Sequence, residues 1–126
     1  MATVFDSTAS DAVDNLAASI YTLLTPPESM WLDLIAESEL SPDATSATQI
    51  LRAHLDYSNF YTTIHQCYLD LVVYGTACLF MANSPLGAAS VFTFTAIPIS
   101  DIAILPNAVF HTTSMSVRDI FTRFPD

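Results

Sequence analysis

Residues 46–83 read SATQILRAHLDYSNFYTTIHQCYLDLVVYGTACLFMAN, and the periodicity of this stretch changes at Gly75. Before Gly75, apolar and aromatic residues recur every three or four positions, which is typical of one face of a helix. This stripe consists of Ile50, His54, Tyr57, Tyr61, Ile64, Tyr68, Leu71 and Gly75. Ser46 and Gln49 have the spacing of a capping box, so one long helix is predicted from Ser46 to about Tyr74. Gly75 is predicted to end this helix in a left-handed conformation.

Upstream of this stretch, a shorter helix is predicted over Ser10–Leu24. Its apolar residues also recur at helical spacing, and the following Pro26–Pro27 pair cannot continue it. The next segment, Glu28–Asp43, is predicted to be a loop that holds the only tryptophan, Trp31. Trp31 is predicted to anchor this loop, because its large ring buries much apolar area while its N–H can reach a carbonyl.

Downstream of Gly75 the pattern favours β-structure, because Val, Thr and aromatic residues alternate and proline-containing turns separate the segments. The predicted strands are Thr76–Asn83, Ser90–Ile97, Asp101–Leu105 and Ser116–Phe124, with turns at Ser84–Gly87 and Pro106–Asn107. We therefore predict an α+β fold with two N-terminal helices followed by a small antiparallel sheet of about three to four strands. Residues 1–126 are predicted to form a single domain.

The composition is unusual for an isolated protein. Hydrophobic residues make up 52% of the chain and charged residues only 13%, which leaves little polar material to cover the surface. Exposed apolar patches are therefore expected, and such patches mark contacts with partners. The net charge is −10, and the only cationic side chains at neutral pH are Arg52, Arg118 and Arg123. This balance argues against a protein that grips DNA phosphates, because that function needs a basic surface.

The sequence lacks the motifs of common enzymes. Gly75 and Gly87 are its only glycines, so a glycine-rich phosphate loop and nucleotide hydrolysis are not expected. It contains no GxSxG or HExxH motif. An enzyme would require His54, His65 or His111 to converge with carboxylates in a cleft, and the spacing does not indicate this. We predict no catalytic, cofactor-binding, metal-binding or nucleic-acid-binding residue, and no cofactor.

Cys67 and Cys78 are the only cysteines, and they lack the CxxC spacing of a redox or metal site. They are predicted to be buried small apolar residues in a protein from a reducing, intracellular compartment, since no signal peptide is recognisable. The longest apolar stretch, Leu71–Ala82, is interrupted and too short to cross a bilayer. No membrane span or membrane partner is predicted.

Eight segments follow one another along the chain in the order of a known family. They are Val4–Ala9, Asn15–Ala18, Leu24–Pro27, Trp31–Leu34, Ser58–Tyr61, Asp70–Leu79, Ile97–Asp101 and Val117–Phe124. The most specific features are the Ser-Asn-Phe step at Ser58–Phe60 and the aromatic-Gly-Thr step at Tyr74–Thr76. Together these segments resemble the start of podovirus-type bacteriophage head-to-tail connector (portal) proteins, and the resemblance spans nearly the whole chain.

The resemblance implies a structural role without enzymatic activity. Portal subunits of this kind form a ring, usually of twelve subunits, at one vertex of the capsid in the virion, after synthesis in the bacterial host cytoplasm. The ring is a conduit for DNA packaging and ejection, and double-stranded DNA passes through it without sequence-specific contact. Sister portal subunits, the capsid protein, the packaging terminase and a tail adaptor are the implied partners. Complete portals are longer, so this chain is expected to be an N-terminal, wing-like fragment of one subunit.

A second interpretation is a small intracellular α+β binding module that captures an apolar ligand or partner. Tyr57, Tyr61 and Tyr68 share one helical stripe, and Phe92 and Phe94 of a predicted strand could face them across a pocket. Packing of the same residues in an ordinary core explains the pattern more simply. The binding module requires a cavity between helix and sheet, whereas an ordinary core fills this space with side chains.

Overall fold

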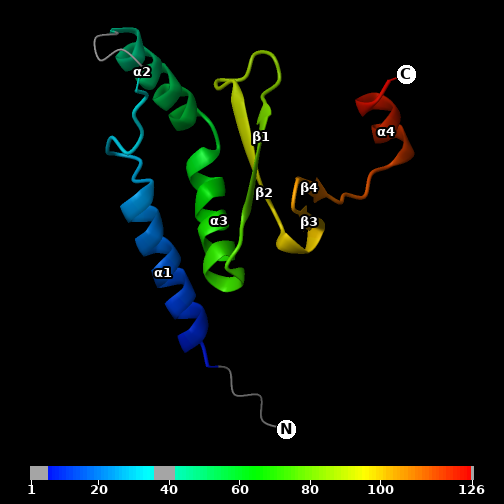
Figure 1. Cartoon of the computed structure of the whole chain (residues 1–126), viewed down its shortest axis with the longest axis horizontal. Helices are drawn as coiled ribbons and strands as arrows, with labels where there is room; N and C mark the ends of the chain where they lie inside the picture. Colours follow the sequence, from blue (N-terminus) through cyan, green and yellow to red (C-terminus); the bar gives the residue numbers. More distant parts are fainter. Residues whose placement is uncertain (1–5, 36–41, 126) are drawn as a thin grey trace.

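The computed structural model describes residues 6–35 and 42–125 (Figure 1). Its elements are the helices α1 (Thr8–Leu24), α2 (Pro42–Tyr57), α3 (Phe60–Tyr74) and α4 (Val117–Arg123), a short 3-10 helix (Ile99–Asp101), and the strands β1 (Cys78–Asn83), β2 (Phe92–Ile97), β3 (Ile102–Leu105) and β4 (Ala108–His111). The predicted α+β class is confirmed. Residues 36–41 of the predicted loop and Val4–Phe5 of the resemblance lie outside the described residues.

Helix α1 agrees closely with the prediction, since it begins at Thr8 instead of Ser10 and ends at Leu24. At its end, the N–H of Thr25 donates to the carbonyl of Tyr21 at 3.0 Å, and a proline follows directly. The chain leaves the helix there because proline lacks the N–H that another turn would need.

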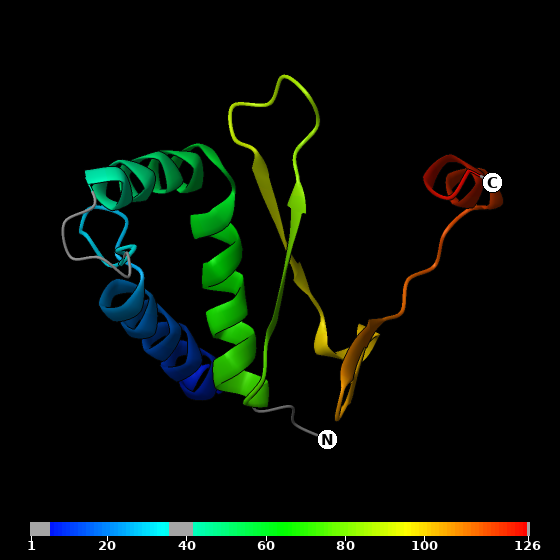
Figure 2. The same ribbon diagram turned by 45° about the horizontal axis from the view of Figure 1, so that its top comes forward.

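The predicted long helix is instead two helices, α2 and α3, separated by Ser58 and Asn59. The Ser58 hydroxyl donates to the carbonyl of Leu55 at 2.7 Å and accepts from the N–H of Phe60 at 3.1 Å. Such side-chain bonds compete with the backbone bonds of a helix, which explains why the prediction of one helix is wrong here. The chain changes direction at this point, and α2 and α3 meet at an angle (Figure 2).

Helix α2 begins at Pro42, earlier than the predicted start at Ser46. Proline suits the first turn of a helix, because its φ is already helical and the missing N–H would have no partner there. Ser46 and Gln49 lie inside the helix and therefore do not form its start. Also within α2, the buried Thr48 hydroxyl accepts the N–H of Leu34 at 3.0 Å and holds the preceding loop against the helix.

Helix α3 lies between α1 and the β1–β2 hairpin (Figure 1). Toward α1 it presents Tyr68, whose hydroxyl oxygen is 3.3 Å from that of Thr25. Toward the hairpin it presents Phe60, whose ring meets that of Phe94 edge to face at a centroid distance of 5.2 Å. The prediction of one buried stripe is therefore wrong, because α3 buries two faces and Tyr57, at the end of α2, is 72% exposed.

Gly75 ends α3 in the left-handed conformation, with φ 72° and ψ 2°, as predicted. Its N–H donates to the carbonyl of Leu71 at 2.8 Å and so satisfies one of the last carbonyls of the helix. A Cβ built on Gly75 would meet no atom within 4 Å. The requirement for glycine is therefore set by backbone conformation and not by space.

We expect Gly75→Val to lower the free energy of unfolding by about 1–2 kcal/mol, because a β-branched residue is strained at positive φ. Gly75→Asn should lose less, since asparagine tolerates this conformation and the surrounding space is open to both side chains. Urea unfolding of the two variants measures the difference. Equal stabilities for the valine and asparagine variants would contradict a backbone origin of the effect.

The strands form two separate two-stranded antiparallel sheets, so the prediction of one sheet with three to four strands is wrong. β1 and β2 pair along their whole lengths, with Cys78 opposite Ile97. Pro98 ends β2 as predicted, and the 3-10 helix that follows turns the chain away from the first sheet. β3 and β4 pair across the predicted turn at Pro106–Asn107, although β4 itself was not predicted.

The predicted last strand, Ser116–Phe124, is also wrong, because most of this segment forms helix α4. The Ser116 hydroxyl accepts the N–H of Asp119 at 3.2 Å and donates to its carboxylate at 2.6 Å. This side-chain cap satisfies a backbone donor that the first turn of a helix would otherwise leave unpaired. The apolar residues then follow helical spacing at Val117, Ile120, Phe121 and Phe124.

The buried core is small and lies where α2, α3 and β2 meet. Its centre consists of Leu55, Phe60 and Phe94. Partly buried apolar residues surround it, namely Trp31, Leu32, Tyr61, Ile64, Leu79 and Phe92. Residues 99–125, here called the C-terminal arm, carry β3, β4 and α4 away from this core (Figures 1 and 2). The arm contributes no residue to the core cluster.

Candidate functional site

The segment Ser58–Phe60, here called the junction, connects the two central helices to the hairpin. The Asn59 side chain donates from Nδ2 to the carbonyl of Phe94 at 2.6 Å, and its Oδ1 accepts the N–H of Phe94 at 2.8 Å. The amide thus bonds the edge of β2 that β1 does not cover, as a neighbouring strand would. Ser90 adds a second hydrogen bond between the hairpin and the helices, because its hydroxyl donates to the carbonyl of His54 in α2 at 2.7 Å.

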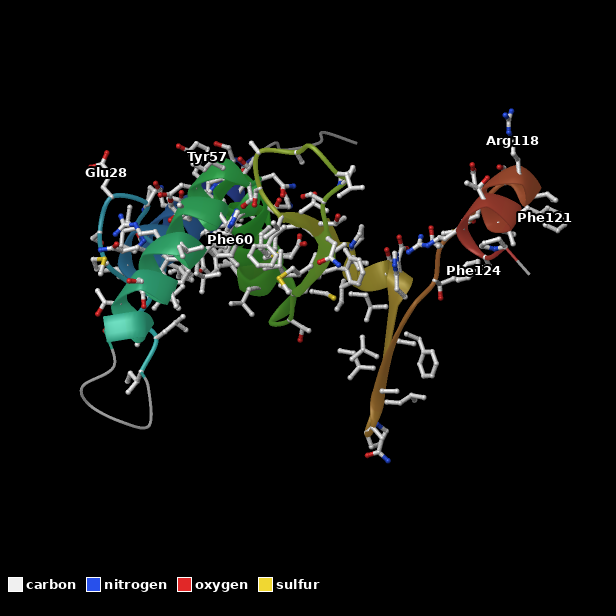
Figure 3. The ribbon with its side chains drawn as sticks, turned by 90° about the horizontal axis from the view of Figure 1, so that it is seen from above. Glu28, Tyr57, Phe60, Arg118, Phe121 and Phe124 are labelled. Carbon is white, nitrogen blue, oxygen red and sulfur yellow. The ribbon has the colours of Figure 1, made fainter. Side chains whose placement is uncertain are left out.

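Phe60 is the centre of an aromatic cluster at the junction. Its ring stacks on Trp31 at 5.6 Å with an interplanar angle of 10°, and it meets Tyr61 and Phe94 edge to face. The prediction that Trp31 anchors the loop is confirmed, although its N–H reaches the hydroxyl of Tyr61 at 3.4 Å and not a carbonyl. The junction and its cluster therefore fix the angle between the helices and the hairpin. In Figure 3, Phe60 lies among the side chains between these elements.

The space that a ligand-binding module would use is filled by side chains. Phe60 packs against Phe94 there, while Tyr61 bonds Trp31 and Tyr68 faces α1. An open depression of about 290 Å³ does include Tyr57 and Phe92, but the rest of its lining is small or polar. The predicted aromatic pocket between helix and sheet is therefore not formed by these residues.

The C-terminal arm carries many exposed apolar side chains, on the β3–β4 hairpin and on α4. Each of the following residues is at least 45% exposed: Ile104, Leu105, Val109, Phe110, Val117, Ile120, Phe121 and Phe124. Figure 3 shows Phe121 and Phe124 on α4, well apart from Phe60. An exposed apolar surface of this extent is typical of a site that binds another protein. Sequence reasoning expected such a surface from the composition but did not locate it.

The whole chain, residues 1–126, matches the family described as bacteriophage head to tail connecting protein. The chain belongs to this family. Connector proteins of this family are structural and not enzymatic. No curated protein and no solved structure matches the chain.

Both motifs that carried the resemblance to phage connectors have structural roles in this connector protein. The Ser-Asn-Phe step is the junction, where Ser58 ends α2, Asn59 binds β2 and Phe60 enters the core. The aromatic-Gly-Thr step at Tyr74–Thr76 is the left-handed turn at which α3 gives way to the hairpin. The two steps lie at opposite ends of α3 and together determine how the hairpin is placed against the helices.

The three histidines of the connector chain lie in different places. His54 packs edge-on against Phe92, His65 packs edge-on against Tyr21, and His111 is exposed on β4. Within residues 6–35 and 42–125, no group of three or more His, Cys, Asp or Glu side chains could hold a metal ion. In the same part of the chain, no helix has both the length and the apolar character needed to cross a membrane.

The two cysteines are free thiols with different exposure. Cys67 is 4% exposed, and its Sγ lies 3.8 Å from the carbonyl oxygen of Cys78, which is only partly buried. Burial raises the pKa of the Cys67 thiol, and the negative charge of Asp70 adds to this effect. The prediction of burial is confirmed for Cys67, whereas Cys78, which was also predicted to be buried, is only partly buried.

We expect iodoacetamide at pH 7.5 to label Cys78 at least about tenfold faster than Cys67, because the thiolate is the nucleophile and burial disfavours it at Cys67. Labelling Cys67→Ser and Cys78→Ser separately, with mass spectrometry as the readout, assigns each rate. The two rates should become similar in urea. Equal rates in the folded protein would contradict the burial of Cys67.

Proposed function

We propose that this connector chain is the outer, wing-like segment of a portal subunit. In this proposal residues 1–126 act as one domain, and copies of the complete subunit form a ring, usually of twelve, at the head-tail vertex of the virion. The ring is the conduit through which DNA enters the capsid during packaging and leaves it during ejection. The proposal rests on membership of the head-to-tail connecting family.

The observation that carries the proposal is the exposed apolar surface of the C-terminal arm. Three aromatic side chains are each more than half exposed, namely Phe110, Phe121 and Phe124. Their exposure to water is unfavourable in a monomer, and burial in an assembly would remove this unfavourable free energy. In this proposal, sister subunits cover this surface in the assembled ring. The capsid protein, the packaging terminase and a tail adaptor would meet other faces of the ring.

The charge of the chain fits an outer position in the ring and not a surface that binds DNA. With a net charge of −10 and three arginines, the segment repels phosphates more than it binds them. Double-stranded DNA would therefore pass without sequence-specific contact. An outer wing needs no phosphate contacts at all.

The test is to express the complete open reading frame that encodes this chain and to image the purified product by negative-stain electron microscopy. Rings with a central channel are expected, and native mass spectrometry should give a single number of subunits near twelve. A product that stays monomeric at every concentration tested would overturn the proposal.

A further inference from the structure

Helix α4 is a separate, unpartnered element of the arm. It follows the extended residues 112–116, which carry it away from the helices (Figures 1 and 2). Only Arg123 and Phe124, at its end, border an open depression of about 540 Å³ that the first hairpin also lines. Its cap at Ser116 stabilises its first turn locally, so it does not depend on the core for its start. Its apolar residues remain exposed, with Val117 and Phe121 both at 69% and Phe124 at 64%. The helix therefore presents a formed apolar face that the described part of the chain leaves mostly exposed.

The charge of α4 is opposite to that of the chain as a whole. Arg118 and Arg123 are two of the three arginines, and with Asp119 they leave the helix at +1 in a chain of net charge −10. Figure 3 shows Arg118 pointing away from the rest of the structure. The Arg123 guanidinium lies 6.0 Å from the centre of the Phe124 ring, so charge and apolar surface occur together. A surface complementary to α4 must combine acidic and apolar groups.

Such a surface exists elsewhere on the same chain, at the C-terminal end of α3. An open depression of about 460 Å³ is lined by Gln66, Asp70, Tyr74, Ala96, Pro98, Ile99 and Ser100. Asp70 supplies the negative charge, and its carboxylate accepts a long hydrogen bond from Gln66 at 3.4 Å. Tyr74 is 62% exposed and supplies apolar area together with Pro98 and Ile99. The volume is sufficient for large side chains of α4.

We infer that α4 of one copy docks into the depression beside Asp70 of a second copy, with Arg123 or Arg118 paired to Asp70 and an α4 phenylalanine against Tyr74. The donor and acceptor surfaces are different, so the contact is head to tail. A head-to-tail contact forms a closed ring when its rotation closes and a filament when it does not. This inference rests on the proposed ring and specifies which surfaces join its subunits.

The experiment uses charge reversal in the complete gene product, with ring yield measured by native mass spectrometry after assembly at about 0.15 M salt, where surface charges are only partly screened. We expect the double variant Arg118→Glu/Arg123→Glu to reduce the ring yield at least about tenfold, and Asp70→Arg alone to do the same, because like charges then face one another. All three substitutions in one chain restore opposite charges across every contact and should recover most of the yield. Asp14→Arg, an exposed acid on α1 reversed in the same way, is the matched control and should leave the yield unchanged.

Three results would overturn this docking. Full ring yield from either reversal would do so, as would failure of the combined variant to recover, or an equal loss from Asp14→Arg. In all three, wild-type rings still form and the proposed function stands. Absence of rings from the wild-type product would instead remove the proposed function. Circular dichroism of each variant confirms folding, which should be unaffected because Arg118, Arg123 and Asp70 all lie outside the core cluster.

Discussion

Phe60→Ala is expected to lower the free energy of unfolding by about 3–5 kcal/mol, which is the usual cost of removing a large aromatic ring from a core. Phe60 is 8% exposed and belongs to the buried centre with Leu55 and Phe94. The ring also stacks on Trp31, so its loss leaves a cavity and removes the support of the loop before α2. Proteins are typically stable by about 5–15 kcal/mol in total, so this is a large fraction.

Phe121→Ala is the matched control, because it makes the same chemical change on a helix residue that is 69% exposed. Its effect on the stability of the monomer should be within about 0.5 kcal/mol. Urea unfolding followed by circular dichroism, at a concentration where copies do not associate, measures both variants. If the two substitutions cost the same, Phe60 is not the centre of the core.

In the helical half of the chain, the periodicity of apolar residues predicted some features correctly and missed others. Spacing predicted α1, the end of α3 at Gly75 and a long run of helical residues before it. Residue spacing placed Tyr57 and Tyr61 in the predicted buried stripe and left out Phe60. Spacing identifies the apolar faces of a helix, but it does not show which neighbouring element each face contacts. The break was signalled only by Ser58 and Asn59, whose side chains compete for backbone bonds.

In the C-terminal half, the sequence supported a strand and a helix over the same residues. The strand prediction for Ser116–Phe124 followed a short alternation, whereas Ser116 and Asp119 already had capping-box spacing and Ile120, Phe121 and Phe124 had helical spacing. The separation of the two sheets arises at Pro98 and the turn after it. Whether the arm is exposed depends on which other segments or chains cover it. Local sequence patterns carry no information about that. Composition alone therefore predicted exposed apolar area, and the structure was needed to show where it lies.

Asn59→Asp is expected to lower the free energy of unfolding by about 2–3 kcal/mol at pH 7, since it removes a donor and places an anion against an acceptor. In the native protein the Asn59 amide donates to the carbonyl of Phe94 at 2.6 Å and accepts its N–H at 2.8 Å. A carboxylate keeps the second bond and faces the Phe94 carbonyl with a negative oxygen. Asn15→Asp, at an exposed site on α1, introduces the same charge without this contact and is the control.

The pH dependence separates this mechanism from a general effect of charge. A carboxyl group that meets a carbonyl is favoured in its protonated form, so the pKa of the carboxyl group introduced by Asn59→Asp should be raised in the folded state. The penalty is then present above that raised pKa and is relieved as the pH falls through it, because the protonated group can donate to Phe94 as the amide does. The stability difference between Asn59→Asp and Asn15→Asp should therefore narrow from pH 7 to pH 5. A difference that stays constant over this range would mean that Asn59 does not bind the edge of β2 through a donated hydrogen bond.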